Sequence, residues 1–112
     1  MKRKLILLAL MLLALWAPDV MADCADLEDE TWRRVEFAGR CEEDSDCIRV
    51  DAPCPFGCDA YINKKNEKRV RSAFNKYYVK CGTCKHECTS SQGTVSCVKK
   101  SCKLVPPGQL QN

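Results

Sequence analysis

Ten cysteines and a single histidine stand out among the reactive side chains of this 112-residue chain. Cys81 and Cys84 have the spacing of a thiol–disulfide redox pair, which needs an accessible, acidified thiolate that usually lies at a helix start. Together with His86 and Cys88 they also provide the donor types of a zinc site. In an exported chain such cysteines are oxidised, so we expect structural disulfides and neither a metal nor another cofactor.

Four carboxylates lie between two nearby cysteines, at Glu42, Glu43, Asp44 and Asp46. Calcium is one partner for such a cluster, but the spacing lacks the glycine turn and the distal glutamate of an EF-hand loop. We therefore expect a solvated acidic loop in which Asp44 or Asp46 accepts hydrogen bonds from backbone N–H groups. No nucleophile elbow, phosphate loop or metalloprotease motif accompanies the histidine, so we expect no enzyme.

Residues 1–22 have the three parts of a signal peptide. Residues 2–4 are basic, residues 5–16 are apolar, and Val20-Met21-Ala22 places small or aliphatic side chains before a cleavage site. The apolar run is shorter than the about 20 residues that a transmembrane helix needs. We expect cleavage, secretion or transfer to the periplasm, and no transmembrane span afterwards. An uncleaved membrane anchor is the alternative.

The remaining chain, residues 23–112, keeps every cysteine. Because residues 1–22 contain three basic and one acidic side chain, cleavage lowers the net charge from +3 to +1. Small exported domains with limited apolar cores depend on disulfides, so we expect reduction to unfold the protein. The sequence leaves the pairing open among roughly 945 combinations. The cysteines expected to pair are Cys24, Cys41, Cys47, Cys54, Cys58, Cys81, Cys84, Cys88, Cys97 and Cys102.

Two helices are expected. Apolar or small side chains recur at helical spacing over residues 27–38, with Asp26 as the expected N-cap and Gly39 as the expected end. Residues 64–79 predict the main helix, which Asn63 would cap and Gly82 would stop. Its apolar face would comprise Val70, Ala73, Phe74, Tyr77 and Tyr78.

Short strands are expected on both sides of the main helix. Residues 47–51 and 58–62 favour strands, and two prolines and a glycine in residues 52–57 indicate a turn between them. Residues 94–98 and 101–105 predict a hairpin around Lys99-Lys100.

The predicted architecture is therefore small, disulfide-rich and α+β. One main amphipathic helix packs on short antiparallel strands, with a second helix towards the N-terminus. We expect a single domain at residues 23–105, followed by a flexible C-terminal tail at residues 106–112.

Charge is divided along the expected mature chain. Residues 23–59 have a balance of −8, and residues 60–112 have a balance of +9. The acidic half either neutralises the basic helix internally, or the basic helix binds anionic lipid, polysaccharide or nucleic acid. Nucleic acid is the least expected partner of an exported chain. The candidate surface for an anionic partner comprises Lys64, Lys65, Lys68, Arg69, Arg71 and Lys76.

The cysteine pattern of about residues 41–104 resembles a loose group of small exported bacterial cysteine-rich proteins. The elements that carry the resemblance are Cys41-x-x-Asp44-x-Asp46-Cys47, Cys54-x-x-x-Cys58, Asn63 with the helix after it, and Ser96-Cys97 separated by four residues from Cys102. That group has no assigned activity as a class, so the resemblance implies a compartment and a style of fold. The first element is also similar to the core of whey-acidic-protein-type inhibitor domains, which implies protease inhibition.

We expect an exported, disulfide-stabilised module that binds a partner or has a structural role and is not an enzyme. Its partner is unknown, with an anionic surface or another exported protein as the candidates. The alternative is a protease inhibitor that presents a disulfide-braced loop at residues 53–57 or 82–87. In the second loop, Lys85 would enter a trypsin-like pocket.

Overall fold

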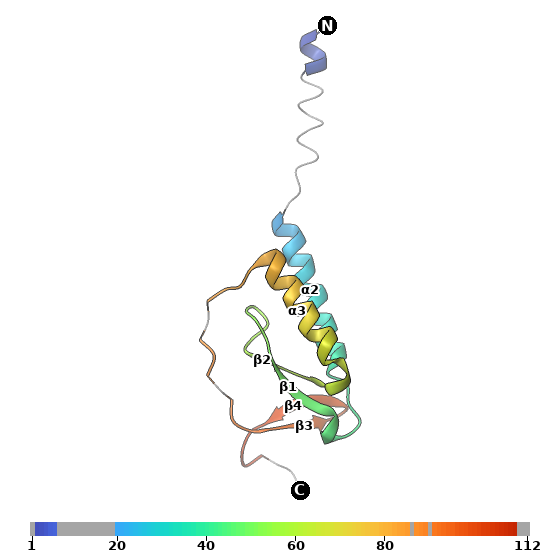
Figure 1. Cartoon of the computed structure of the whole chain (residues 1–112), viewed down its shortest axis with the longest axis vertical. Coiled ribbons are helices and arrows are strands. Elements are labelled where there is room, and N and C mark those ends of the chain that lie inside the picture. The colour runs from blue at the N-terminus through green and yellow to red at the C-terminus, as the bar shows by residue number, and fades with distance from the viewer. Residues whose placement is uncertain (1, 7–19, 86, 90, 110–112) are drawn as a thin grey trace.

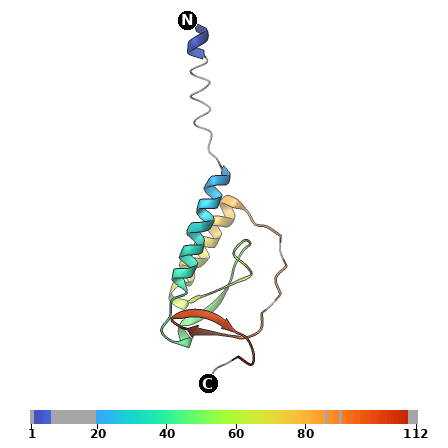
Figure 2. The same cartoon turned by 180° about the vertical axis from the view of Figure 1, so that it is seen from behind.

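The computed structural model describes residues 2–6, 20–85, 87–89 and 91–109, and at residues 20–22 it describes the backbone alone. Two long helices lie side by side, and two β-hairpins gather near one end of the pair (Figures 1 and 2). The elements are α2 (Val20–Ala38), the 3-10 turn η1 (Asp44–Asp46), β1 (Cys47–Asp51), β2 (Asp59–Asn63), the 3-10 turn η2 (Lys64–Asn66), α3 (Glu67–Cys81), β3 (Thr94–Val98) and β4 (Ser101–Val105).

Helix α2 contains the helix predicted over residues 27–38 but begins earlier, at Val20. Asp26 therefore lies inside the helix, and its prediction as the N-cap is wrong. No proline or glycine separates Val20 from Leu27, so nothing in that stretch stops the helix. Gly39 follows the last helical residue as predicted, and its N–H donates to the carbonyl of Val35 at 3.1 Å.

The predicted cleavage site after Ala22 falls within the first turn of α2. Most of the apolar run of the predicted signal peptide, residues 7–16, lies outside the described residues. Where the chain is described, none of its helices combines the length and the apolar character needed to cross a bilayer.

The antiparallel pair β1–β2 matches the predicted strands within one residue. Cys47 pairs with Asn63 at one end and Asp51 with Asp59 at the other. Val50, Ala60 and Ile62 are buried because one face of this hairpin packs against the helices.

Helix α3 forms after a brief 3-10 turn rather than directly at Lys64. Asn63 caps that turn, because its side chain accepts a hydrogen bond from the N–H of Lys65 at 3.1 Å. At the other end Gly82 adopts a φ of 75°, and its N–H donates to the carbonyl of Tyr78 at 2.8 Å. A residue other than glycine is strained at such a φ.

The apolar face of α3 is narrower than predicted. Val70, Phe74 and Tyr77 are buried, as expected. Tyr78 is 54% exposed, so its assignment to the buried face is wrong. Its direction differs from that of Tyr77 by about 100° around the helix, and the core contacts only one side of α3.

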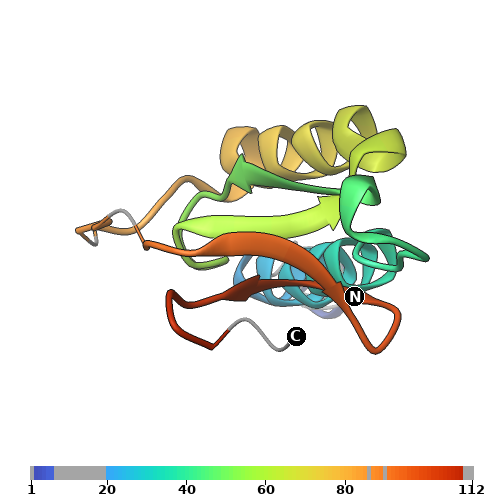
Figure 3. The ribbon, with the colours of Figure 1, turned by 90° about the horizontal axis from the view of Figure 1, so that it is seen from below.

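The hairpin β3–β4 has the predicted bounds, with Lys99 and Lys100 as its two-residue turn. Both turn residues have positive φ angles, of 50° and 66°. The hairpin lies beside β1–β2, as Figure 3 shows from below. The N–H of Cys102 also donates to the carbonyl of Gly39 at 2.7 Å, which attaches β4 to the end of α2.

The core lies between the two helices, β1–β2 and the turn that joins those strands. Phe56, in that turn, is buried against three aromatic rings, with centroid distances of 5.3 Å to Trp32, 5.4 Å to Phe74 and 4.9 Å to Tyr77. The buried cluster comprises Leu27, Ala38, Val50, Ala52, Phe56, Ala60, Ile62, Val70, Phe74 and Tyr77.

Five disulfides complete the fold and confirm that all ten cysteines pair. The Cα–Cα distances lie between 5.3 and 5.9 Å, in the usual range for bridged cysteines. The bridges are Cys24–Cys81, Cys41–Cys97, Cys47–Cys102, Cys54–Cys84 and Cys58–Cys88. The molecule is a small disulfide-rich α+β fold, as predicted.

Candidate functional site

The cysteine motifs of the sequence are separated by the pairing. Cys81 and Cys84 do not pair with each other: Cys81 is bridged to Cys24 in α2, and Cys84 to Cys54 in the turn after β1. Cys88 is bridged to Cys58, and His86 lies outside the described residues. The three cysteines of the candidate zinc cluster therefore each belong to a different bridge.

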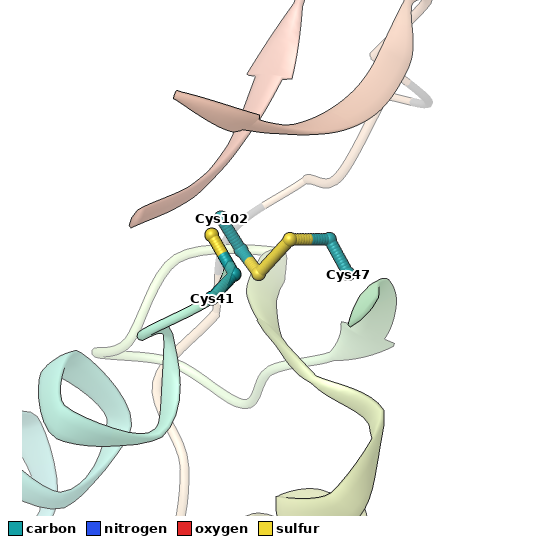
Figure 4. A group of neighbouring side chains, drawn as sticks. All are labelled: Cys41, Cys47 and Cys102. Carbon is teal, nitrogen blue, oxygen red and sulfur yellow. A yellow bond between two sulfur atoms is a disulfide. The ribbon is translucent and has the colours of Figure 1, made fainter. Parts of the chain in front are cut away.

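A different group of sulfur atoms does come together. The Sγ atoms of Cys41, Cys47 and Cys102 lie within 4.8 Å of one another (Figure 4). Cys47 and Cys102 are bridged to each other, and Cys41 is bridged to Cys97, which is the cross-strand neighbour of Cys102. The group is the contact point of two disulfides, and with its thiols oxidised it offers no thiolate to a metal.

The acidic loop is held by its own carboxylates, as predicted. Asp46 accepts hydrogen bonds from the N–H groups of Glu42 at 2.9 Å and Glu43 at 3.1 Å. These two bonds lower the pKa of Asp46 below its ordinary value. Asp44 accepts a hydrogen bond from the N–H of Cys97 at 2.8 Å, which joins the loop to β3. The loop therefore uses two of its carboxylates to order the backbone.

All six basic residues of the candidate anionic-partner surface are exposed, and they lie in different surroundings. Lys68, Arg69 and Lys76 line a groove between α2 and α3. Arg71 lies outside that lining and forms an ion pair with Glu67 at 3.6 Å. Lys64 and Lys65 lie nearer the acidic loop, where their positive charges help to lower the pKa of Asp46.

The groove, called the interhelical groove below, consists of two adjoining depressions of about 320 and 410 Å³. Glu30, Arg34 and Arg69 line both depressions, so the groove is continuous along the helix pair. Apolar side chains form its floor, and long cations stand at its edges. The floor comprises Leu27, Ala38, Val70 and Ala73, and the cations are Arg33, Arg34, Lys68, Arg69 and Lys76.

The ends of the helix pair fix the width of this groove. Near one end, the disulfide Cys24–Cys81 joins the beginning of α2 to the end of α3. At the opposite end, the side chain of Asn66 donates to the carbonyl of Ala38 at 3.3 Å, and that of Asn63 donates to the carbonyl of Arg40 at 3.1 Å. The cations of two antiparallel helices are thus held opposite one another.

Glu30 is the one carboxylate that lines the groove among the described residues. It lies one helical turn before Arg34, whose guanidinium donates two hydrogen bonds to it, at 2.7 and 3.2 Å. The hydrogen bonds and charge of Arg34, with a smaller effect from Lys76, lower the pKa of Glu30 below its ordinary value. The remaining four cations face the groove without a lining carboxylate of their own.

Phe37 stands at the apolar end of the groove and is 62% exposed. The guanidinium of Arg40 lies over its ring, 4.7 Å from the centroid. Sequence patterns singled out neither Phe37 nor the arginines Arg33 and Arg34. These residues are identified by their position beside a second helix. The sequence of α2 alone does not show which of its residues face α3.

The candidate inhibitor loop is a separate surface. Lys85 is exposed and lies between Cys84 and Cys88, both of which are bridged to the turn between β1 and β2. The long connection that carries it from α3 to β3 runs on the other side of this turn from α2 (Figures 1 and 2). The loop at residues 53–57 contains the buried Phe56, and Pro53, Cys54 and Pro55 are partly buried. Of the two loops, that of Lys85 is therefore the more accessible.

No known family model, curated protein or solved structure matches the chain.

Proposed function

We propose that this protein is an exported, non-enzymatic binding module whose interhelical groove takes an anionic partner. The single observation that supports the proposal is the lining of the groove, where five cations face one carboxylate over an apolar floor. Clustered charge of one sign raises the local concentration of an oppositely charged partner and accelerates its association.

The framework supports the same proposal. The five disulfides suit an oxidising compartment, where they hold a small fold with a limited core. With the helix pair fastened near both ends, little conformational entropy is lost when a partner binds, and preorganisation of this kind favours affinity.

Polyglutamate is a suitable first probe, measured by isothermal titration calorimetry on the oxidised protein. We expect binding at low salt that is lost at about 0.5 M salt. At that ionic strength, the attraction between exposed charges extends over only a few ångströms. Arg69→Gln, in the centre of the groove, should weaken binding by about fivefold, which corresponds to the about 1 kcal/mol typical of an exposed ion pair.

Arg71→Gln is the matched control, because it removes the same charge from the same helix outside the groove. Equal weakening by both variants would show that net charge, and not the groove, controls binding. Binding that persists unchanged at high salt would contradict the electrostatic basis of the proposal.

A second candidate is a protease inhibitor that acts through Lys85. The supporting observation is that Lys85 is exposed between two bridged cysteines, where its side chain is accessible to a trypsin-like pocket. The similarity of the acidic loop to inhibitor cores points the same way. A panel of serine proteases tests this candidate: inhibition that Lys85→Ala abolishes supports it, and no inhibition at micromolar protein rejects it.

A further inference from the structure

The interhelical groove differs along its length, and the difference bears on the class of its partner. The half near Lys76 is bordered by cations and by short polar side chains such as Ser72. The half near Phe37 is lined by that exposed ring, by Ala38 and Val70, which are only 4% and 1% exposed, and by Arg33 and Arg69. The groove thus combines a site for negative charge with a site for an apolar group.

The apolar end of the groove presents an exposed aromatic ring. Phe37 is exposed at the last turn of α2, and the guanidinium of Arg40 lies over its ring at 4.7 Å. This cation–π contact leaves the ring 62% exposed. Arg33 lies one helical turn before Phe37, on the same side of α2, so a charged and an aromatic contact are available about one turn apart.

These features distinguish between anionic partners. A sulfated or phosphorylated polysaccharide needs the cations, but it carries no large apolar side chain to pack on the exposed ring of Phe37. A bilayer surface is flat, whereas the floor of this groove lies between two helices. A polypeptide with acidic and apolar side chains satisfies the edges and the floor together, as peptides do in other hydrophobic grooves.

We propose that the interhelical groove binds an acidic segment of another polypeptide. An apolar side chain of that segment packs on the exposed ring of Phe37, and its carboxylates accept hydrogen bonds from Arg33 and Arg69. This inference rests on the proposed function, whose partner it names by chemical class.

Glu30 and Arg34 regulate this binding. The carboxylate of Glu30 occupies the guanidinium of Arg34 through hydrogen bonds of 2.7 and 3.2 Å. A carboxylate of the incoming segment competes with Glu30 for that guanidinium. The negative charge of Glu30 also repels the incoming carboxylate. Removing the charge of Glu30 therefore strengthens binding, the opposite of what loss of an ordinary contact does.

The test compares two labelled peptides of equal charge by fluorescence anisotropy on the full-length oxidised protein. One contains glutamate with leucine and phenylalanine, and the other has serine in place of both apolar residues. We expect the first peptide to bind about tenfold more tightly, since burial of one large apolar side chain has an effect of this size. Phe37→Ser should remove most of this difference and leave the weaker binding of the serine peptide.

Two pairs of variants test whether the charges that affect binding are those that line the groove. Arg69→Gln should weaken both peptides by about fivefold, whereas Arg71→Gln should leave them within about twofold. Glu30→Gln should strengthen both peptides, whereas Asp29→Asn removes the same charge from α2 outside the groove lining and should change them little. All four side chains are exposed, so the variants should fold.

Heparin and vesicles of phosphatidylglycerol provide the competing outcomes. Equal affinity for the two peptides, or tighter binding of heparin or vesicles, would overturn the acidic-segment inference and leave an anionic partner in place. Failure of both peptides, polyglutamate, heparin and vesicles to bind at low salt would overturn the proposed function itself.

Discussion

The hairpin β1–β2 contributes Val50, Ala60 and Ile62 to the apolar core, whereas the part of β3–β4 that the structure describes contributes no member of that cluster. The buried residues of β3–β4 are Ser96 and Cys102, and Val95 and Leu104 are only partly covered. Two hairpins of equal strand length and similar topology therefore depend on different forces.

Covalent and polar contacts attach β3–β4 to the rest of the molecule. Cys97 and Cys102, which face each other across the hairpin, are bridged to the two ends of the acidic loop, at Cys41 and Cys47. The N–H of Cys97 donates to Asp44, and that of Cys41 donates to the carbonyl of Lys100 at 3.1 Å. Disulfides and hydrogen bonds thus attach β3–β4, a hairpin that adds no side chain to the apolar cluster.

Truncation in the core should have the largest effect. Phe56→Ala removes a ring that contacts Trp32, Phe74 and Tyr77, and we expect a loss of about 3–5 kcal/mol in the free energy of unfolding, because a cavity remains. Urea denaturation of the oxidised protein measures it. Leu104→Ala in β4 is the control and should cost much less. Similar losses from both variants would contradict the difference between the hairpins.

Removal of a bridge should be the next largest effect and should be local. In the double variant Cys47→Ala, Cys102→Ala we expect a loss of about 2–4 kcal/mol. Hydrogen exchange should accelerate in β3–β4 while α3 keeps its protection. The double variant Cys24→Ala, Cys81→Ala should instead loosen the end of the helix pair. Faster exchange throughout α3 in the first variant would show that the core also depends on this bridge.

A smaller effect should depend on pH through Asp46. Its folded-state pKa is lowered by the N–H groups of Glu42 and Glu43, so its contribution is present above the ordinary value of 3.8 and is lost as pH falls through the lower folded value. Thermal unfolding of the wild type should therefore lose stability in acid, and Asp46→Asn should reduce this loss. Asp51→Asn provides a comparison of equal charge at an exposed residue outside the acidic loop. An identical acid response in wild type and Asp46→Asn would show that Asp46 does not contribute.

The smallest effect should be a gain in stability at the β3–β4 turn. Lys99 has a φ of 50°, a conformation that asparagine tolerates better than lysine in two-residue hairpin turns. Lys99→Asn should stabilise the protein by about 0.5 kcal/mol, detectable as a higher melting temperature. Lys103→Asn, in the extended strand nearby, should not stabilise it. A lower melting temperature of Lys99→Asn would mean that the lysine side chain stabilises the protein through contacts that outweigh the strain of its backbone conformation.

Much of the local structure could be predicted because its causes are local. Alternation of side chains and the Lys99-Lys100 turn predicted β3–β4 with its correct bounds. Asn63, Gly39 and Gly82 marked helix boundaries through capping and backbone conformation. The start of α2 was missed because Asp26, a good capping residue, is followed and preceded by residues that also form helix.

The candidate site could be predicted only in part. Helical spacing placed Lys68, Arg69 and Lys76 on an exposed face, and they line the groove. The same spacing could not exclude Arg71, which lies on that helix but outside the groove. Arg33 and Arg34 were not predicted, because their role depends on the position of α3 beside α2.

By itself, the sequence of this protein determined the disulfide-rich class, the hairpins and the two helices, because periodicity, turn chemistry and cysteine content are properties of short stretches. The tertiary structure alone decided which cysteines meet and which cations face each other. Pairings such as Cys24–Cys81, separated by 57 residues, depend on how distant elements pack. The interhelical groove exists for the same reason: its charges belong to two helices, and only packing brings them to one site.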